Sequence, residues 1–330
     1  MSSTPSKPWT TLPAHGGPVS ITTHALHLSI SGPPRSSPTD PLIIIFPGAG
    51  DISLSWIPVQ RLLSPKFRVL LYDRSGLFLS ERGPNRAIPT VAAEELHTAL
   101  MNASLTPPYI LVAHSYGAII AREFLYLHPD SVAGMVLADP STERQHLFFK
   151  IPDPDIIAVF GSLNFARVTG LREDAKLTVE EWRERAKGIA KGNAVTQEEA
   201  AGFAEICETL GEKRQIEKRV LGTRPLSVIR CNGKRDFERM YEAGVEAGNG
   251  TEEERRRFRE SLDGWEEKDR GLKEELLGLS GRSRMVVLED CGHNVQLVRP
   301  DVVAEEVDWV VGLVGEGERD SDESLGRASL

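Results

Sequence analysis

Cysteine is scarce in this chain. The 330 residues contain only Cys207, Cys231 and Cys291, and no two of them have C-x-x-C spacing. An odd, widely spaced set argues against a disulfide framework and against a zinc site. We therefore expect reduced thiols, no bound metal and a cytoplasmic protein.

Long apolar runs and excess positive charge are also missing. No stretch approaches the roughly 18 consecutive apolar residues of a membrane span, and residues 1–8 lack the apolar segment of a signal peptide. Lysine and arginine number 39 against 48 acidic residues, a net charge of −9. A nucleic-acid partner is disfavoured, because phosphate binding needs a basic surface. The final Ala328-Ser329-Leu330 resembles a peroxisomal signal without its central base, so peroxisomal import is a minor alternative.

What the chain does have is an alternation of buried strands and helices. Continuous apolar runs predict strands buried on both faces, at residues 42–46, 67–72, 109–113, 133–138, 226–230 and 285–288. Helices are expected between them, for example at 56–63 and 91–102. This order predicts an α/β fold with a mostly parallel central sheet flanked by helices. An apolar–polar alternation over 19–30 adds an antiparallel edge pair.

The alternation stops between the strands at 133–138 and 226–230. Thr178 with Glu181 and Thr196 with Glu199 both have the spacing of a capping box, which begins a helix. We therefore expect a helical lid over 141–223, inserted between core segments 19–140 and 224–314. Residues 1–18 are predicted to form a flexible arm. The polar residues 315–330 are predicted to form a disordered tail, after a last helix at about 302–311.

The stretch Tyr109-Ile-Leu-Val-Ala-His-Ser-Tyr-Gly117 has the pattern of a nucleophile elbow. In such an elbow a serine sits on a tight turn between a strand and a helix. Small residues must flank the serine because strand and helix nearly touch there, and Ala113 and Gly117 meet this need. The turn raises the Ser115 hydroxyl above the sheet edge.

A serine hydroxyl needs a base within reach, and the base needs a carboxylate to fix its tautomer. His293 follows the strand at 285–288, and Asp236 follows the strand at 226–230. Both therefore come at carboxyl strand ends, where sites form in α/β sheets. Ser115, His293 and Asp236 are the predicted nucleophile, base and acid. Asp139 is the main alternative acid, and Glu238 a further one.

Over about residues 19–312 the chain resembles the α/β-hydrolase superfamily, and in particular its small cofactor-free members. The resemblance is carried by residues 46–50, 72–76, 113–117, 136–140 and 290–293, and by the order Ser, Asp, His. Three positions depart from the family pattern. Pro47 stands where many members have histidine, Ala113 replaces the first elbow glycine, and Phe78 replaces a loop glycine.

The resemblance implies an oxyanion hole made by the backbone N–H groups of Ala49 and Tyr116. Pro47 has no N–H, so the loop donor is Gly48, Ala49 or Gly50. Asp73 and Arg74 are expected to brace the loop that they open, and His114 to pack or to line the pocket.

These residues predict a serine hydrolase without metal or organic cofactor. It would cleave an ester, lactone or thioester with an apolar body, and the resemblance extends to enzymes of natural-product metabolism. Phe160, Phe165 and Ile206 of the lid either roof the pocket or only pack onto the core. Two alternatives remain open: the same triad in lyase, acyl-transfer or peroxidase chemistry, and a ligand receptor with little turnover. A partner-binding role for the charged 250–270 segment is a weaker one.

Overall fold

The computed structural model describes residues 8–328, with side chains described for residues 8–315. These residues form an eight-stranded sheet with the order β1-β2-β4-β3-β5-β6-β7-β8. β3 to β8 are parallel, and β1 and β2 join one edge as antiparallel strands. The strands are β1 (Ala14–Ser20), β2 (Ala25–Ser31), β3 (Leu42–Phe46), β4 (Arg68–Tyr72), β5 (Tyr109–His114), β6 (Val132–Ala138), β7 (Leu226–Cys231) and β8 (Ser283–Leu288). The predicted α/β class with a mostly parallel sheet is confirmed.

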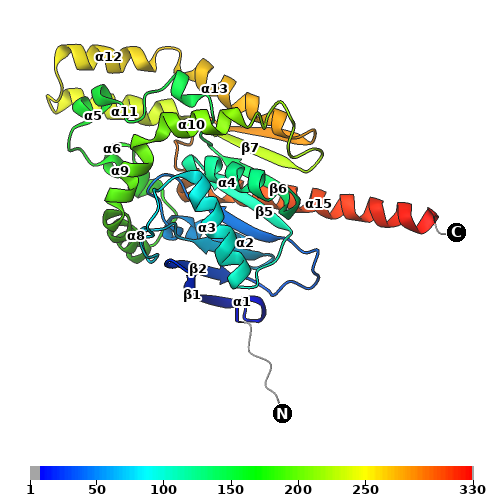
Figure 1. Ribbon diagram of the computed structural model, residues 1–330. Coiled ribbons are helices and arrows are strands. Elements are labelled where there is room, and N and C mark those ends of the chain that lie inside the picture. Colours follow the sequence, from blue (N-terminus) through cyan, green and yellow to red (C-terminus); the bar gives the residue numbers. More distant parts are fainter. Residues whose placement is uncertain (1–7, 329–330) are drawn as a thin grey trace.

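The continuous apolar runs arise because each central strand is covered on both faces. Successive side chains of a strand point to opposite faces, so Leu42, Ile44 and Phe46 belong to one core and Ile43 and Ile45 to the other. α3 (Pro89–Asn102) and α4 (Tyr116–Leu127) cover the first face, as Figure 1 shows. α2 (Ile57–Leu63) and α15 (Pro300–Ala328) cover the second.

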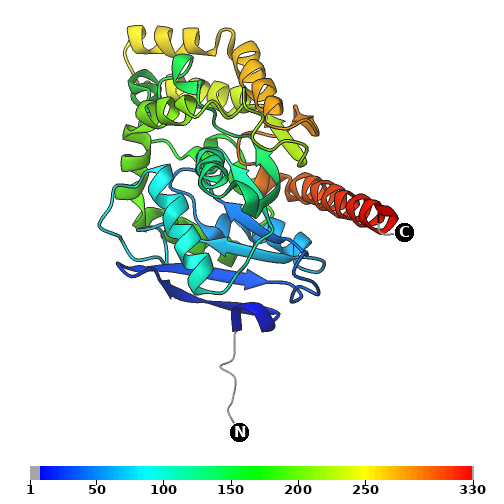
Figure 2. The same cartoon turned by 45° about the vertical axis from the view of Figure 1, so that its right-hand side comes forward.

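Two helical segments interrupt the strand–helix order, not one. Residues 141–223 contain α5 (Pro154–Phe160), α6 (Phe165–Val168), α7 (Leu171–Asp174), α8 (Val179–Lys191), α9 (Asn193–Ala201) and α10 (Phe203–Glu212). After β7 the chain forms α11 (Gly233–Glu246), α12 (Glu252–Leu262) and α13 (Trp265–Glu275), within the segment predicted as core. Val159 of α5 packs with Met240, Phe258 and Leu262, so helices of the two segments share one small core. Figures 1 and 2 show α12 lying far from the sheet.

The predicted ends of the chain are wrong in the described part. The proline, glycine and serine content predicts a loose arm over 1–18, but α1 (Pro8–Thr11) and β1 lie within it, and β1 pairs with β2 along its whole length. Backbone hydrogen bonds to the sheet edge outweigh the poor strand propensity of these residues. The polar tail predicted from 315 continues α15 to Ala328, and Figure 2 shows this helix projecting from the body. Residues 1–7 and, of the C-terminal tripeptide, Ser329 and Leu330 lie outside the described residues.

The elbow between β5 and α4 has the sharp turn that its sequence predicts. Ser115 adopts φ 50° and ψ −124°, a conformation that non-glycine residues rarely take. α4 begins at the next residue, and Gly117 lies so close to β3 that a Cβ there would stand 2.1 Å from the carbonyl oxygen of Phe46. The absence of a side chain at Gly117 is therefore what allows the turn.

We expect Gly117→Ala to destabilise the fold by about 3 kcal/mol, because the added methyl group forces the elbow away from β3. Gly312→Ala in α15 is the matched control. Nothing lies within 4 Å of a Cβ at Gly312, so alanine there should stabilise the helix by about 0.5–1 kcal/mol. Urea unfolding of both variants measures the difference, and an unchanged midpoint for Gly117→Ala would contradict the close approach.

Candidate active site

Ser115 lies at the carboxyl edge of the sheet, where it lines a large cavity. The cavity has a volume of about 650 Å³, and Ala49, Tyr116, Asp139 and His293 line it together with Ser115. Among the described residues the Ser115 hydroxyl makes no hydrogen bond to the His293 ring. Bonds of this kind often tighten only when a substrate binds. The structure thus brings the predicted nucleophile and base to one cavity wall.

Three side chains hold His293 itself in the loop after β8. The His293 Nδ1 lies 2.5 Å from Asp139 Oδ2, and the backbone N–H of His293 donates to Asp236 Oδ2 at 2.9 Å. The ring of His114 donates from Nε2 to the backbone carbonyl of His293 at 2.8 Å. Burial lowers the pKa of His114 to about 3, so this ring stays neutral and acts as a fixed donor. His114 therefore anchors the loop, and with a pKa this low it is not suited to proton transfer.

The predicted contact between Asp236 and the His293 ring is not formed; Asp139 occupies that place. α11 begins at Gly233, which puts Asp236 in its first turn, where the carboxylate reaches the loop backbone. A Cβ on Gly292 would stand 2.3 Å from the Asp236 oxygens, so this approach requires glycine before the histidine. Glu238, the further alternative, pairs with Lys234. The acid in contact with the imidazole follows β6, not β7.

Asp139 lies in a buried polar pocket that stabilises its ionised form. The backbone N–H of Cys231 donates to Oδ1 at 3.2 Å, and the Lys273 ammonium lies 3.6 Å from the same oxygen. Burial alone would raise the pKa of Asp139, but Lys273 and then His293 outweigh it and hold the pKa well below its usual range. Lys273 itself comes from α13, donates to the Pro140 carbonyl and pairs with Asp269.

The backbone loop at residues 47–50 faces the elbow. A Cβ on Gly48 would lie 3.4 Å from the Ser115 Cβ. The N–H of Gly50 donates to Glu199 Oε2 at 2.7 Å, so it is already engaged. Tyr116 is the first residue of α4, a position whose N–H has no acceptor within its own helix. Ala49 and Tyr116 line the cavity, and Gly48 remains the other loop donor.

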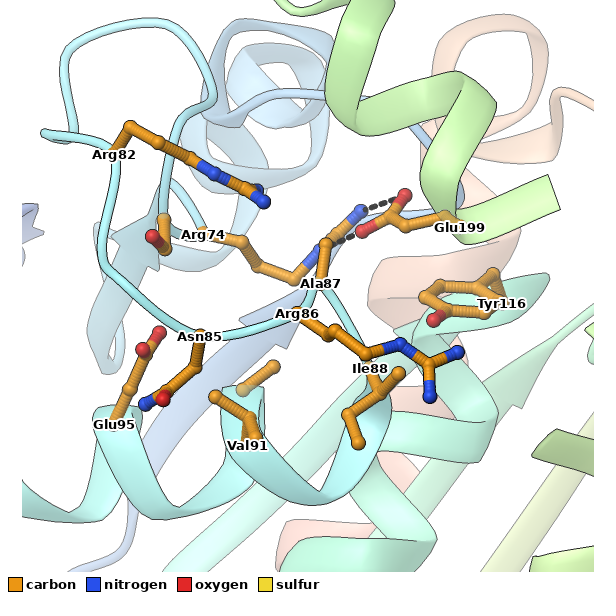
Figure 3. A pocket seen from close by; sticks show the side chains of 12 residues that line it. Arg74, Arg82, Asn85, Arg86, Ala87, Ile88, Val91, Glu95, Tyr116 and Glu199 are labelled. Carbon is orange, nitrogen blue, oxygen red and sulfur yellow. Dashed lines mark hydrogen bonds and ion pairs between the residues drawn. The ribbon is translucent and has the colours of Figure 1, made fainter. Parts of the chain in front are cut away.

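Glu199 lines the cavity, a position that its local sequence pattern does not predict. Its capping-box spacing predicts a helix start at Thr196, but α9 begins at Asn193 and the Thr196 hydroxyl donates to the Gly192 carbonyl. The Glu199 carboxylate instead pairs with Arg74, as Figure 3 shows. The capping box of Thr178 and Glu181 is confirmed. A buried partner 125 positions away leaves no local signal at Glu199 in the sequence.

The cavity wall is largely apolar and comes from both helical segments. Its apolar side chains include Phe148, Phe149, Ile151, Ile156, Ile157, Phe203, Phe237 and Trp265. Phe148, Ile151 and Ile157 are 42%, 38% and 58% exposed, so the rim is open to solvent. Phe160 and Phe165 instead pack in the small core of α5, α11 and α12, and Ile206 packs on the main core. Of the two roles open for these three residues, packing is the one that the structure favours.

Comparison with known proteins places the chain in a family. The family model of the alpha/beta hydrolase fold matches residues 41–172. An AB hydrolase superfamily protein of Gibberella zeae is 33% identical over 302 residues, which cover 88% of this chain and 92% of the relative. The chain belongs to the α/β-hydrolase superfamily.

Other relatives of this α/β-hydrolase have different descriptions. A probable transporter of Hormonema carpetanum is 31% identical over 92% of this chain, but the match spans only 44% of that protein. The crystal structure of a putative lipase from Acinetobacter baumannii has a TM-score of 0.65 at 14% identity, and covers 94% of this chain and 95% of its own. At such low sequence identity the structural similarity supports a shared fold and nothing further. Among the helices of residues 8–328, none combines the length and the apolar character of a membrane span.

The buried charge of Asp139 predicts a pH-dependent stability of the α/β-hydrolase. A carboxyl group with a depressed folded pKa stabilises the fold above its unfolded pKa of about 3.9 and loses this contribution as the pH falls toward the folded value. We expect Asp139→Asn to lower the free energy of unfolding by about 1–3 kcal/mol near neutral pH. The gap to wild type should narrow below about pH 4. Urea unfolding across this range measures it, and a gap that stays constant or widens in acid would contradict the assignment.

Proposed function

We propose that this α/β-hydrolase is a serine hydrolase that cleaves an ester, lactone or thioester through an acyl-enzyme. The observation that carries the proposal is the combination of Ser115 on its strained turn with the His293–Asp139 pair, 2.5 Å apart, in one cavity. The superfamily supplies the general class, a hydrolase. The residue roles and the substrate class are our own inference.

In the proposed reaction the Ser115 Oγ attacks the carbonyl carbon while the Nε2 of His293 takes its proton. The Nδ1–H of His293 donates to Asp139, which leaves Nε2 free as the base and stabilises the imidazolium that forms. The same histidine then returns the proton to the leaving group and activates a water that releases the acyl group. Asp236 and His114 would take no part in proton transfer, since both hold the loop backbone.

The developing oxyanion needs two backbone donors, and loss of one typically costs about 10²–10³-fold in rate. We assign these donors to Ala49 and Tyr116, the pair that the family resemblance implies. The engagement of the Gly50 N–H by Glu199 supports this choice, because it removes one of the alternatives.

The cavity supports a substrate with an apolar body. Its volume of about 650 Å³ is typical of small-molecule sites, and its rim carries the exposed side chains of Phe148, Ile151 and Ile157. The ring of Trp265 packs against two further rings: its centre lies 4.4 Å from the ring centre of Phe149 and 4.5 Å from that of Phe237. We infer that the helices of residues 141–223 act with α11–α13 as a lid over this cavity.

The nucleophile is tested with a fluorophosphonate probe. We expect labelling of the wild type at Ser115 and none in Ser115→Ala, because only a hydroxyl activated by His293 attacks phosphorus quickly. Ser141→Ala is the matched control, since Ser141 is a second serine in the same cavity, and it should still be labelled. A folded wild type that binds apolar ligands without being labelled would favour a receptor over an enzyme.

The choice of acid is tested by comparing Asp139→Asn with Asp236→Asn on p-nitrophenyl butyrate. Asp139→Asn should lower kcat by up to about 10⁴-fold, because the amide favours the wrong tautomer of the histidine. Asp236→Asn keeps an acceptor oxygen for the His293 N–H, so its loss of kcat should be far smaller. A larger loss in Asp236→Asn would restore the acid predicted from the sequence.

A further inference from the structure

A buried ion pair joins Glu199 of helix α9 to Arg74, which follows β4 and contacts the loop at residues 47–50. The Arg74 Nε donates to Glu199 Oε1 at 2.8 Å, and its Nη2 donates to Oε2 at 3.0 Å. Figure 3 shows the two side chains meeting beside the ring of Tyr116. Arg74 is 4% exposed and Glu199 2%. The pair therefore lies in the interior, where solvent does not screen it.

Both members of the pair also bind the backbone of the loop at residues 47–50. Arg74 donates from Nη1 to the Pro47 carbonyl at 2.8 Å and from Nη2 to the Gly48 carbonyl at 2.7 Å. Glu199 accepts the Gly50 N–H at 2.7 Å. The two side chains thus fix the peptide groups on either side of Ala49. A fixed orientation of these peptides is what a preformed oxyanion hole requires.

Helix α9 rests directly on the loop. Gly50 has φ +60°, and a Cβ there would stand 2.1 Å from the Thr196 Oγ1. Glu199 and Ala200 of the same helix line the large cavity. The Arg74 Cζ lies 5.8 Å from the ring centre of Tyr116, the residue of the second proposed donor. The helix, the loop and the elbow therefore meet at one point.

Glu199 stabilises the charged form of the buried Arg74. Burial alone lowers the pKa of Arg74, but Glu199 outweighs it through charge and hydrogen bonds, so the pKa lies above its ordinary value. A buried charge that loses its partner is strongly unfavourable. Undocking of α9 would remove the carboxylate partner of Arg74 and the acceptor of the Gly50 N–H, so the loop would lose contacts that hold its present geometry.

We propose that Glu199 is a positioning residue: it sets the shape of the oxyanion loop through Arg74 and Gly50, and so makes the hole depend on the docking of α9. This inference rests on the proposed function, since it assigns the loop to oxyanion binding. Glu199 would thus act on the reaction from the helical segment without contacting the reacting atoms.

The chain offers a matched control on the same helix. Glu198 pairs with Arg82 at 2.6 Å and accepts the Ala87 N–H at 2.7 Å. These contacts also tie α9 to the core, but both partners lie outside the 47–50 loop. A role limited to holding the helix predicts similar effects for Glu198→Ala and Glu199→Ala, whereas a role in the hole predicts an effect for Glu199 alone.

The test measures three quantities with p-nitrophenyl butyrate as substrate: kcat, KM and the affinity for phenylboronic acid, whose adduct with the serine mimics the tetrahedral state. N-(4-nitrophenyl)butanamide serves as a ground-state analogue. We expect Glu199→Ala to lower kcat by about 10-fold to 10²-fold, less than or equal to the lower end of the roughly 10²–10³-fold that loss of a donor costs. Boronate affinity should fall in parallel, while KM and amide binding change less than about twofold. Glu198→Ala should leave all of them within about twofold.

Glu199→Gln and the double variant Arg74→Gln/Glu199→Gln keep the test informative where the unpaired Arg74 charge unfolds the single alanine variant. Glu199→Gln keeps one acceptor and should fall between wild type and alanine. The double variant removes both charges and should fold, yet still lose kcat. The proposal would be overturned if Glu199→Ala raised KM and weakened amide binding as much as it lowered kcat. It would also be overturned if Glu198→Ala lowered kcat to the same extent. A wild type inert to fluorophosphonate would instead overturn the proposed function.

Discussion

The position of the His293 loop is the constraint on which the site depends. The loop at residues 289–294 has no regular secondary structure, and hydrogen bonds to three buried side chains hold His293 in it. His114 is the last residue of β5, Asp139 follows β6, and Asp236 lies in the first turn of α11 after β7. Asp139 orients the ring, Asp236 binds the backbone N–H, and His114 binds the backbone carbonyl. Because buried polar groups are costly when unpaired, each bond makes displacement of the loop unfavourable. The parallel sheet brings the three side chains together, since the carboxyl ends of its strands lie at one edge.

Much of this arrangement was predictable because its signals are local. The apolar run before Ser115, with small residues at Ala113 and Gly117, specifies a buried strand and a close turn, and the structure has both. The choice between Asp139 and Asp236 was not predictable. Both follow parallel strands, and the outcome depends on where α11 begins and on which side of the loop each carboxylate lies. A side-chain direction of this kind is fixed by packing, which a single sequence does not encode in any spacing.

Glu199 illustrates the same limit more sharply. Its spacing from Thr196 matches a capping box, and local chemistry offers no reason to reject that interpretation. The residue it actually meets, Arg74, is 125 positions away. A charge–charge contact over that distance has no periodicity, whereas Thr178 and Glu181 form their box because the helix does begin between them. At Phe78, in contrast, the sequence does carry a local signal, because many family members have glycine at this position. Phe78 adopts a positive φ of 44°, a conformation that favours glycine.

The two helical segments each place one buried charge at the edge of the sheet. Glu199 comes from the first and meets the loop opposite the elbow; Lys273 comes from the second and meets Asp139. An apolar side chain of similar volume would pack at either position without the cost of desolvating a charge, so stability alone is a weak reason for these pairs. What they have in common is that each depends on a helix being docked. Removal of α9 would take the Glu199 carboxylate away from Arg74, and removal of α13 would take the Lys273 ammonium away from Asp139. The polar geometry around Ser115 is thus a property of sheet and helices together, and the strand ends alone do not produce it.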